Sequence, residues 1–247
     1  MRLLMINPNT TASITERVVD VARRCAAPDT EILGATGRFG ARYISSRSAA
    51  AIAGHAALDA WANAEPHDAV VLACFGDPGL DALRELSPKP VVGMADASIH
   101  AACMLGQRFA IVTGGERWVA MLEEFVAARG LAGRLAGVLA LPQTGAAIAQ
   151  DPDGALDALA ACCRTAVSER AADCVILGGA GLAGLPARIA HRVEVPLVDC
   201  VIAAVGQAQG LAALAVSKPQ AGSLALPAPV PSVGLSPALA ARIGPME

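Results

Sequence analysis

The segment DAVVLACFGDPGL, residues 68–80, decides the fold, because the chain contains a second version of it. Residues 173–185 read DCVILGGAGLAGL and align with the first segment without a gap, each position lying 105 residues after its counterpart. In both segments a short apolar run ends in glycine and other small residues. This pattern is typical of a buried parallel strand that opens onto a loop at its carboxyl end.

Two neighbouring stretches repeat in the same order. The residues RLLMIN at 2–7 match RFAIVT at 108–113, and PVV at 90–92 matches PLV at 196–198. One such match is easily produced by chance in an alanine-rich chain, whereas three at almost one spacing indicate an internal duplication. We therefore predict two similar lobes, the first formed by residues 1–97 plus 205–247 and the second by residues 98–204.

The predicted fold class is α/β, with two pseudo-symmetric Rossmann-like lobes. Each lobe holds a mainly parallel sheet flanked by helices, and the active site lies in the interlobe cleft. Strands are predicted at 2–6, 69–73, 91–94, 109–113, 174–177 and 197–198. Helices are predicted at 11–24, 48–63, 79–86, 117–129, 154–169 and 185–190. A last helix over 201–216 is expected to return to the first lobe, followed by a Pro/Ala-rich tail.

The composition narrows the class of protein. The chain has 247 residues, 54% of them hydrophobic and 17% charged, with a formal net charge of −3. The sequence has no stripe of basic residues of the kind that indicates nucleic-acid binding, and none of its apolar runs is long enough for a membrane span. The seven cysteines show no metal-ligand spacing, and the first residues do not resemble a signal peptide. We expect a cytoplasmic protein without a metal site.

Cys74 is the strongest candidate for chemistry. It follows a predicted buried strand, precedes a glycine-containing turn, and lies shortly before a helix expected to begin near Pro78. A helix N-terminus at this distance is expected to lower the pKa of the thiol and so favour the thiolate. The alternative is that Cys74 simply fills space in the core, as buried cysteines often do.

Other candidates lie at the carboxyl ends of the remaining predicted strands. Asn7 is expected to point its amide into the cleft, although it could instead serve the turn before the first helix. The loop over 37–47 carries three arginines and the only tyrosine of the chain. It could close over an anionic substrate or remain solvated, and Tyr43 is its strongest substrate-binding candidate. The remaining substrate-binding candidates, several through their backbone N–H groups, are Phe75, Gly76, Thr113, Gly114, Ala180 and Gly181.

The segment ILGGAGLAGL at 176–185 is not a phosphate-binding loop, because no Gly-Lys-Ser/Thr follows it. Gly179, Gly181 and Gly184 satisfy the GxGxxG spacing, but that spacing alone is weak evidence for a dinucleotide site. The internal repeat is more specific. It places Gly179 where the first lobe has Cys74, and so makes this segment the second half of a paired site.

Three stretches resemble the hydantoin/allantoin racemase branch of the aspartate/glutamate racemase superfamily: INPNTT at 6–11, ACFGDPGL at 73–80 and VPLVD at 195–199. The resemblance implies paired α/β lobes, no cofactor and no metal. It also implies two cysteines, one per lobe, of which one thiolate removes the α-proton while the other thiol protonates the opposite face. Cys74 matches the first cysteine. The position of the second carries Gly179, and the substrate loop departs from the family pattern, reading GARYISS at 40–46.

We therefore predict a cofactor-independent racemase of the hydantoin or amino-acid racemase type. It would act by thiol-mediated proton transfer at the α-carbon of a small carbonyl or carboxylate compound. Cys200 or a water molecule would then serve the second face. The alternatives are a single-cysteine decarboxylase or lyase similar to arylmalonate decarboxylase, and a ligand-binding protein without turnover. We expect a homo-oligomer with a small-molecule substrate and no nucleic-acid or membrane partner.

Overall fold

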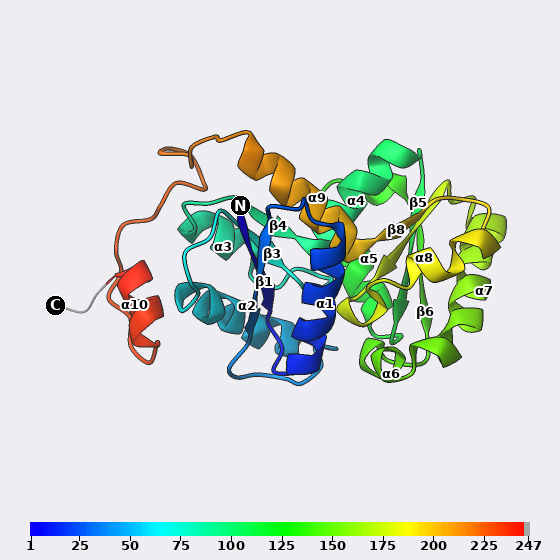
Figure 1. The fold of residues 1–247 in the computed structure, drawn as a ribbon, viewed down its shortest axis with the longest axis horizontal. Helices are drawn as coiled ribbons and strands as arrows, with labels where there is room; N and C mark the ends of the chain where they lie inside the picture. Colours follow the sequence, from blue (N-terminus) through cyan, green and yellow to red (C-terminus); the bar gives the residue numbers. More distant parts are fainter. Residues whose placement is uncertain (245–247) are drawn as a thin grey trace.

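The computed structural model describes residues 1–244 and contains two parallel four-stranded sheets, as the repeat predicted (Figure 1). The first sheet has the order β2-β1-β3-β4 and the second the order β6-β5-β7-β8. The strands of the first are β1 (Arg2–Asn7), β2 (Glu31–Thr36), β3 (Ala69–Leu72) and β4 (Val91–Gly93). Those of the second are β5 (Phe109–Gly114), β6 (Leu135–Leu141), β7 (Cys174–Gly178) and β8 (Leu197–Asp199).

All six predicted strands are confirmed, each with both ends within one residue of the prediction. The sequence analysis missed β2 and β6. Both are edge strands, and both carry exposed or half-buried residues along most of their length. The central strands β1, β3, β5 and β7 are almost continuously buried, which is why their apolar runs stood out in the sequence.

Helices cover the sheets on both faces. The first half contains α1 (Ala12–Cys25), α2 (Arg47–Ala62), α3 (Leu80–Leu86) and α4 (Met94–Leu105). The second half contains α5 (Trp118–Ala128), α6 (Gly145–Gln150), α7 (Pro152–Arg170), α8 (Pro186–Ile189) and α9 (Cys200–Ala213), with short 3-10 turns at Ala132–Arg134, Ala180–Leu182 and Ala190–Arg192. Local chemistry sets their ends. For example, the Asp151 carboxylate caps α7 by accepting a hydrogen bond from the Gly154 N–H at 3.1 Å.

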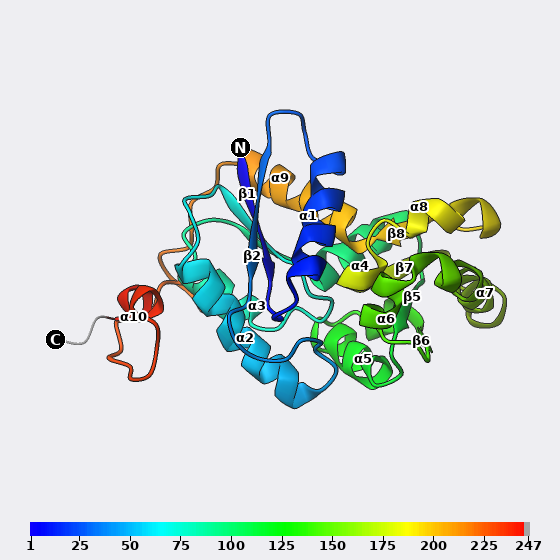
Figure 2. The ribbon, with the colours of Figure 1, turned by 60° about the horizontal axis from the view of Figure 1, so that its bottom comes forward.

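Two helices cross between the halves. The helix α9 follows β8 but packs on β3 and β4 of the first sheet, next to α4 and α1. Conversely, α4 follows β4 but packs on β7 and β8 of the second sheet. Figure 2 shows both helices between the two sheets. The proposed lobe boundaries at 97/98 and 204/205 fall inside these two helices.

The core is shared by the two halves. Alternate residues of β1 face opposite sides: Leu4 and Ile6 pack on α2 and α3, whereas Leu3 and Met5 face the helices between the sheets. The cluster that contains Leu3 and Met5 continues without a break to Ile111 on β5. The two sheets are therefore held in one fixed relation.

The Pro/Ala-rich carboxyl-terminal tail differs from the prediction, which placed no helix in it. It contains the short helix α10 (Pro237–Ile243), which packs on α2 at the outer end of the first half (Figure 1). Leu239 of α10 is fully buried, and the Arg242 guanidinium lies 5.2 Å from the centre of the Trp61 ring. The predicted helix over 201–216 is confirmed as α9, which ends at Ala213.

Candidate active site

The carboxyl ends of the central strands of both sheets meet at one cavity, whose empty volume is about 510 Å³ including its open mouth. Ligand sites in open parallel sheets lie at this edge. Eight of the residues proposed from the sequence line the cavity: Tyr43, Cys74, Phe75, Thr113, Gly114, Gly179, Ala180 and Gly181. The sequence analysis missed eight others: Asn9, Ile14, Ile44, Ala73, Trp118, Gly145, Ala146 and Leu182.

Cys74 follows the end of β3 and is only 9% exposed. Ala73 continues the line of the strand by donating its N–H to the Ile6 carbonyl at 2.7 Å, which leaves Cys74 at the cavity wall. Burial raises the pKa of the thiol well above its usual range, and the charge of nearby Asp77 adds to the effect. The predicted lowering of this pKa is wrong. The helix α3 begins only at Leu80, so burial outweighs any effect of its N-terminus.

Gly179 follows β7 in the second half and lines the same cavity. A Cβ at this position would lie 3.4 Å from Leu182 Cδ1 and 3.9 Å from Thr113 Oγ1, which are ordinary contact distances. The backbone, however, has φ of 140° and ψ of 137°, a conformation that residues with a side chain rarely adopt. The second position of the pair therefore has room for a side chain but a backbone that suits glycine.

Cys200, a candidate replacement for the second thiol, lies behind Gly179 and not in the cavity lining. It is the first residue of α9 and is fully buried. Its sulfur is 3.7 Å from the Gly179 carbonyl oxygen, to which the thiol donates a weak hydrogen bond. Burial, followed by the charge of Asp199, raises the pKa of this thiol well above its usual range. Cys200 therefore contacts Gly179 from the side of the turn that faces away from the cavity.

Two aromatic rings pack across the boundary between the two halves, near the turns that follow β3 and β7. The Phe75 ring, from the turn after β3, lies over Gly178 at the end of β7, where a Cβ would be only 2.4 Å from Phe75 Cε1. The Trp118 ring, at the start of α5, lies over Gly76, where a Cβ would be 2.7 Å from Trp118 Cζ3. Each half therefore places an aromatic ring on a glycine of the other half. Gly76 serves this packing and is not in the cavity lining, where the sequence analysis expected it.

Tyr43 closes the cavity from the loop between β2 and α2. Its hydroxyl donates a hydrogen bond to the Gly114 carbonyl at 3.2 Å and accepts one from the Gly145 N–H at 3.1 Å. Both partners belong to the second half, so Tyr43 joins the halves across the cavity. Burial raises the pKa of its phenol, which stays protonated at neutral pH.

Asn7 does not point its amide into the cavity, contrary to the expectation from the sequence. It is fully buried, and its Nδ2 donates to Asn9 Oδ1 at 3.0 Å and to Thr15 Oγ1 at 3.0 Å. Asn7 is therefore used to hold the loop after β1 against α1. The neighbouring Asn9 lines the cavity instead. Thr113 lines the cavity with its hydroxyl donating to the Gly178 carbonyl at 2.7 Å.

The cavity lining carries no Asp, Glu, Lys, Arg or His among residues 1–244. Two of the arginines of the loop over 37–47 are paired elsewhere. Arg38 holds the buried Asp59 through two hydrogen bonds of 2.7 and 2.8 Å, and Arg47 pairs with Glu124 of α5 at the surface. The same part of the chain contains no group of three or more His, Cys, Asp or Glu placed to hold a metal ion.

Residues 3–208, most of the chain, match the family described as Asp/Glu/Hydantoin racemase. The chain belongs to this family. The hydantoin racemase of Paenarthrobacter aurescens is 37% identical over 231 residues, which cover 92% of this chain and 98% of that protein. The hydantoin racemase of a Pseudomonas species, strain NS671, is 34% identical over 207 residues, covering 83% of each chain. These relatives support a racemase, an enzyme of the isomerase class.

Solved structures of the Asp/Glu/hydantoin racemase family superimpose closely. The allantoin racemase of Pseudomonas fluorescens is 37% identical with a TM-score of 0.91, covering 95% of this chain and all of that one. The allantoin racemase of Klebsiella pneumoniae is 33% identical with a TM-score of 0.91, and each chain is covered in full. Arylmalonate decarboxylase, at 18% identity and a TM-score of 0.60, shares the fold. None of the helices within residues 1–244 has the length and apolarity that crossing a membrane requires.

Proposed function

We propose that this protein racemises a small, neutral cyclic amide of the hydantoin or allantoin type without a cofactor, and that Cys74 carries the proton. The observation that supports the proposal most directly is a buried thiol at the wall of a cavity whose lining bears no charged side chain within the described residues. The named hydantoin and allantoin racemases that resemble this chain agree with this substrate class.

The lack of charge in the lining favours a neutral substrate over an amino acid or dicarboxylate. Bringing a carboxylate into a buried site without a cationic partner costs several kcal/mol, of order 2–7 even for an uncharged polar group. Asn9, Tyr43 and Thr113 offer only neutral hydrogen-bonding groups, and much of the remaining lining is apolar or glycine. A ring of amide N–H and C=O groups matches such a surface better than a charged molecule does.

The reaction moves one proton off the α-carbon and one onto its other face. In one direction the Cys74 thiolate takes the α-proton, the electron pair of the C–H bond moves onto the neighbouring carbonyl as an enolate, and the thiol results. In the other direction the Cys74 thiol gives its proton to the enolate carbon. The N–H groups of Phe75, Ala180 and Gly181, which line the cavity, are our candidates for stabilising the enolate oxygen.

The second face of the substrate would lie toward Gly179. Because glycine has no acid or base, we assign the second proton transfer to a water molecule near Thr113, whose Oγ1 lies 3.9 Å from the position of a Cβ at Gly179. This assignment separates the protein from a two-thiol racemase. It predicts slower turnover, since a water molecule is a weaker acid and a weaker base than a paired thiol and thiolate.

A single-thiol decarboxylase or lyase is the second candidate, and Gly179 is the observation that favours it. Such an enzyme protonates an enolate from one face after carbon dioxide leaves, so it needs one thiol and no partner opposite. The uncharged cavity weighs against this candidate, because its substrate enters as a carboxylate.

Heavy-water exchange tests the proposal. Single enantiomers of allantoin and of 5-substituted hydantoins are incubated with enzyme in heavy water, and chiral chromatography with mass spectrometry follows inversion and deuterium uptake together. We expect inversion with uptake, above the rate of an enzyme-free control. Uptake with retention would indicate one-face chemistry, and binding without uptake would leave a ligand-binding protein. The open-chain N-carbamoyl amino acids are matched charged controls, and their preferential turnover would overturn the neutral-substrate proposal.

A further inference from the structure

Asp77 joins the turn that carries Cys74 to the first turn of α4. Its carboxylate accepts a hydrogen bond from the Ala95 N–H at 3.0 Å and one from the Asp96 N–H at 2.8 Å. Asp77 is 5% exposed and has φ of 46°, a left-handed conformation that aspartate tolerates better than most residues. The N-cap of α4 is Gly93, which has no side chain to offer, so the cap comes from Asp77 in the turn.

The second half contains an equivalent link between turn and helix, but there the carboxylate belongs to the helix N-cap. Asp199, the N-cap of α9, accepts hydrogen bonds from Val201 N at 2.9 Å and Ile202 N at 3.2 Å, and also from Gly184 N at 2.6 Å in the turn after β7. In the repeat, Asp199 corresponds to Gly93, and Leu182 corresponds to Asp77. In each half one carboxylate thus joins the turn to the helix. It comes from the turn in the first half and from the helix N-cap in the second.

The two placements exclude each other. A Cβ at Gly93 would lie 2.2 Å from Asp77 Oδ2, so a carboxylate on the helix side cannot coexist with one on the turn side. Only the first half has its carboxylate on the turn, and only the first half has a thiol at the cavity, three residues before Asp77. The carboxylate and the thiol therefore occur together on one turn.

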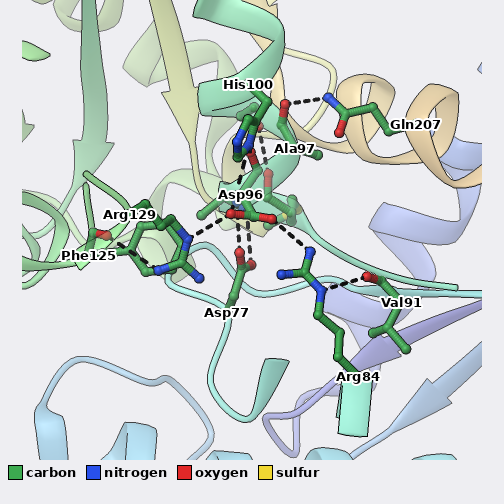
Figure 3. Close-up of polar contacts among 12 residues, drawn as sticks. Asp77, Arg84, Val91, Asp96, Ala97, His100, Phe125, Arg129 and Gln207 are labelled. Carbon is green, nitrogen blue, oxygen red and sulfur yellow. Dashed lines mark hydrogen bonds and ion pairs between the residues drawn. The ribbon is translucent and has the colours of Figure 1, made fainter. Parts of the chain in front are cut away.

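A charge network extends this joint to the second half (Figure 3). The Asp96 carboxylate accepts hydrogen bonds from Arg84 of α3 at 2.7 Å and from Arg129, next to the end of α5, also at 2.7 Å. Burial acts to raise the pKa of Asp96, but the two arginines outweigh it and hold that pKa below its usual range. The first turn of α4, which Asp77 grips, is thereby fixed to both halves.

We propose that Asp77 is a positioning residue for Cys74, because its carboxylate clamps the thiol-bearing turn onto α4 and places a negative charge beside the thiol. The groups that face this carboxylate are Cys74 on its own turn, Asp96 on α4 and Arg129 beside α5. Arg84 and His100 reach it only through Asp96. Where Asp77 is ionised, its charge acts in the same direction as burial and keeps the Cys74 thiol protonated, so that the thiol can donate its proton.

The consequence for turnover rests on the function proposed for Cys74, but the test does not. Iodoacetamide alkylates the thiolate, so the rate of labelling of the Cys74 peptide, measured by mass spectrometry, reports how easily this thiol ionises. We expect Asp77→Asn to label about tenfold faster than the unmodified protein near pH 9, because the charge that disfavours the thiolate is gone. Half-buried Cys162 on α7 is the internal reference, because burial alone raises its pKa and neither Asp77 nor Asp199 acts on it.

Asp199→Asn is the matched control, since it removes the equivalent joint without touching the Cys74 turn. It should leave Cys74 labelling within about twofold. Equal Cys74 labelling in Asp77→Asn and the unmodified protein at every pH, with similar Tm, would overturn the proposal. A loss of turnover in Asp77→Asn without any change in labelling would mean a purely structural role, which also overturns it.

An exchange of the two residues covers the case in which Asp77→Asn does not fold. Asp77→Gly removes the clamp, and Asp77→Gly/Gly93→Asp rebuilds it in the arrangement of the second half. The Leu80 side chain must shift in the double variant, because its Cδ2 lies 2.7 Å from the position of a Cβ at Gly93. We expect the double variant to regain a substantial part of the Tm lost in Asp77→Gly. A double variant no more stable than Asp77→Gly would show that no clamp exists.

Discussion

The ring of Phe75 lies where a side chain at Gly178 would have to be, with Phe75 Cε1 only 2.4 Å from the position of a Cβ. The two residues come from the turns that end β3 and β7, so this contact sets how closely the two halves approach at the cavity. Gly178 is thus a packing requirement of the opposite half, in contrast to Gly179, whose space is open.

Gly178→Ala is expected to push the Phe75 ring away and to disturb Cys74, the residue immediately before Phe75. Overpacking of this kind typically lowers stability by about 1–3 kcal/mol. Gly137→Ala is the matched control: it lies in β6 of the same sheet, and a Cβ there would meet only Arg170 side-chain atoms at 3.9 Å and beyond. Urea unfolding and heavy-water exchange measure both variants. Equal losses in the two variants would contradict the role of the Phe75 contact.

Cys74→Ser is expected to lower deuterium uptake by about 10²–10⁴-fold, since general acid–base catalysis contributes this much and a serine hydroxyl is a far poorer proton carrier than a thiol. Its Tm should change little because the side chains are similar in size. Cys162→Ser on α7, away from the cavity lining, is the control for cysteine loss and should keep full activity. Unchanged uptake in Cys74→Ser would refute the catalytic assignment.

Gly179→Cys places a thiol opposite Cys74 but in a backbone with φ of 140°. We expect a loss of about 1–3 kcal/mol in stability, the usual cost of a residue in a sparsely populated conformation. Gly179→Ala should lose a similar amount, because it carries the same strain without the thiol. If the cysteine variant nevertheless racemises faster than the alanine variant, the cavity is competent for two-thiol chemistry. Equal rates in the two variants would indicate that the thiol is not delivered to the substrate.

Tyr43→Phe removes the hydroxyl that joins Gly114 and Gly145 across the cavity. It leaves a buried N–H and a buried carbonyl without this partner, at a cost of about 1–3 kcal/mol. The expected kinetic effect is a larger KM with a smaller change in kcat, because the cavity would close less completely around the substrate. Phe39→Leu, in the same loop but outside the lining, is the control for loop stability. A change confined to kcat would assign Tyr43 a part in proton transfer instead.

The contribution of Asp77 to the stability of the protein should fall as the pH rises from about 4 to 7. Burial raises the pKa of Asp77 to about 7, although its two backbone N–H partners oppose the shift. Between the unfolded and folded values, the folded state therefore holds a proton that the unfolded state has lost. The stabilisation that Asp77 provides is complete below the pKa of aspartate in the unfolded chain and is lost as the pH rises through 7. Over that range its contribution to the free energy of unfolding falls by up to about 1.4 kcal/mol per pH unit.

Urea unfolding of Asp77→Asn and the unmodified protein at several pH values isolates this contribution. Burial also raises the pKa of Asp199, so some slope of the same sign remains in the variant. Between pH 4 and 7, the free energy of unfolding should therefore decrease less with rising pH in Asp77→Asn than in the unmodified protein. Parallel curves would mean that Asp77 keeps an ordinary pKa in the folded protein.

The sequence predicted the fold well because the repeat marked the central strands. It failed at the edge strands β2 and β6. The β2 segment EILGAT is interrupted by polar residues and glycine, and β6, although its segment LAGVLAL is apolar, lies outside the stretches that the repeat marks. It also missed α10, although Ser236 caps this helix and Pro237 begins it, because these signals lie within a Pro/Ala-rich tail; contact with α2 holds the helix in place.

The candidate site was predictable where residues follow the repeated strands, and less so elsewhere. Cys74 and Gly179 line the cavity because they sit at equivalent strand ends. Asn7 ends β1 and Asn9 follows it, and only the hydrogen bonds of Asn7 to Asn9 and Thr15 reveal which one is used internally. Trp118 and Gly145 reach the cavity from segments that carry no repeat, so contact alone identifies them. Asp77 lies within the repeat, but its counterpart is Leu182, which concealed the shared joint.

The crossing of α4 and α9 amounts to a domain swap inside one chain, since each half lends its last helix to the sheet of the other. A half excised at a strand–helix junction would expose the sheet face that its partner's helix covers. We therefore expect that neither half folds on its own. Unfolding of the whole chain should be a single cooperative transition, with calorimetric and van't Hoff enthalpies in agreement. An ancestral single half would have needed a second copy of itself to complete its core.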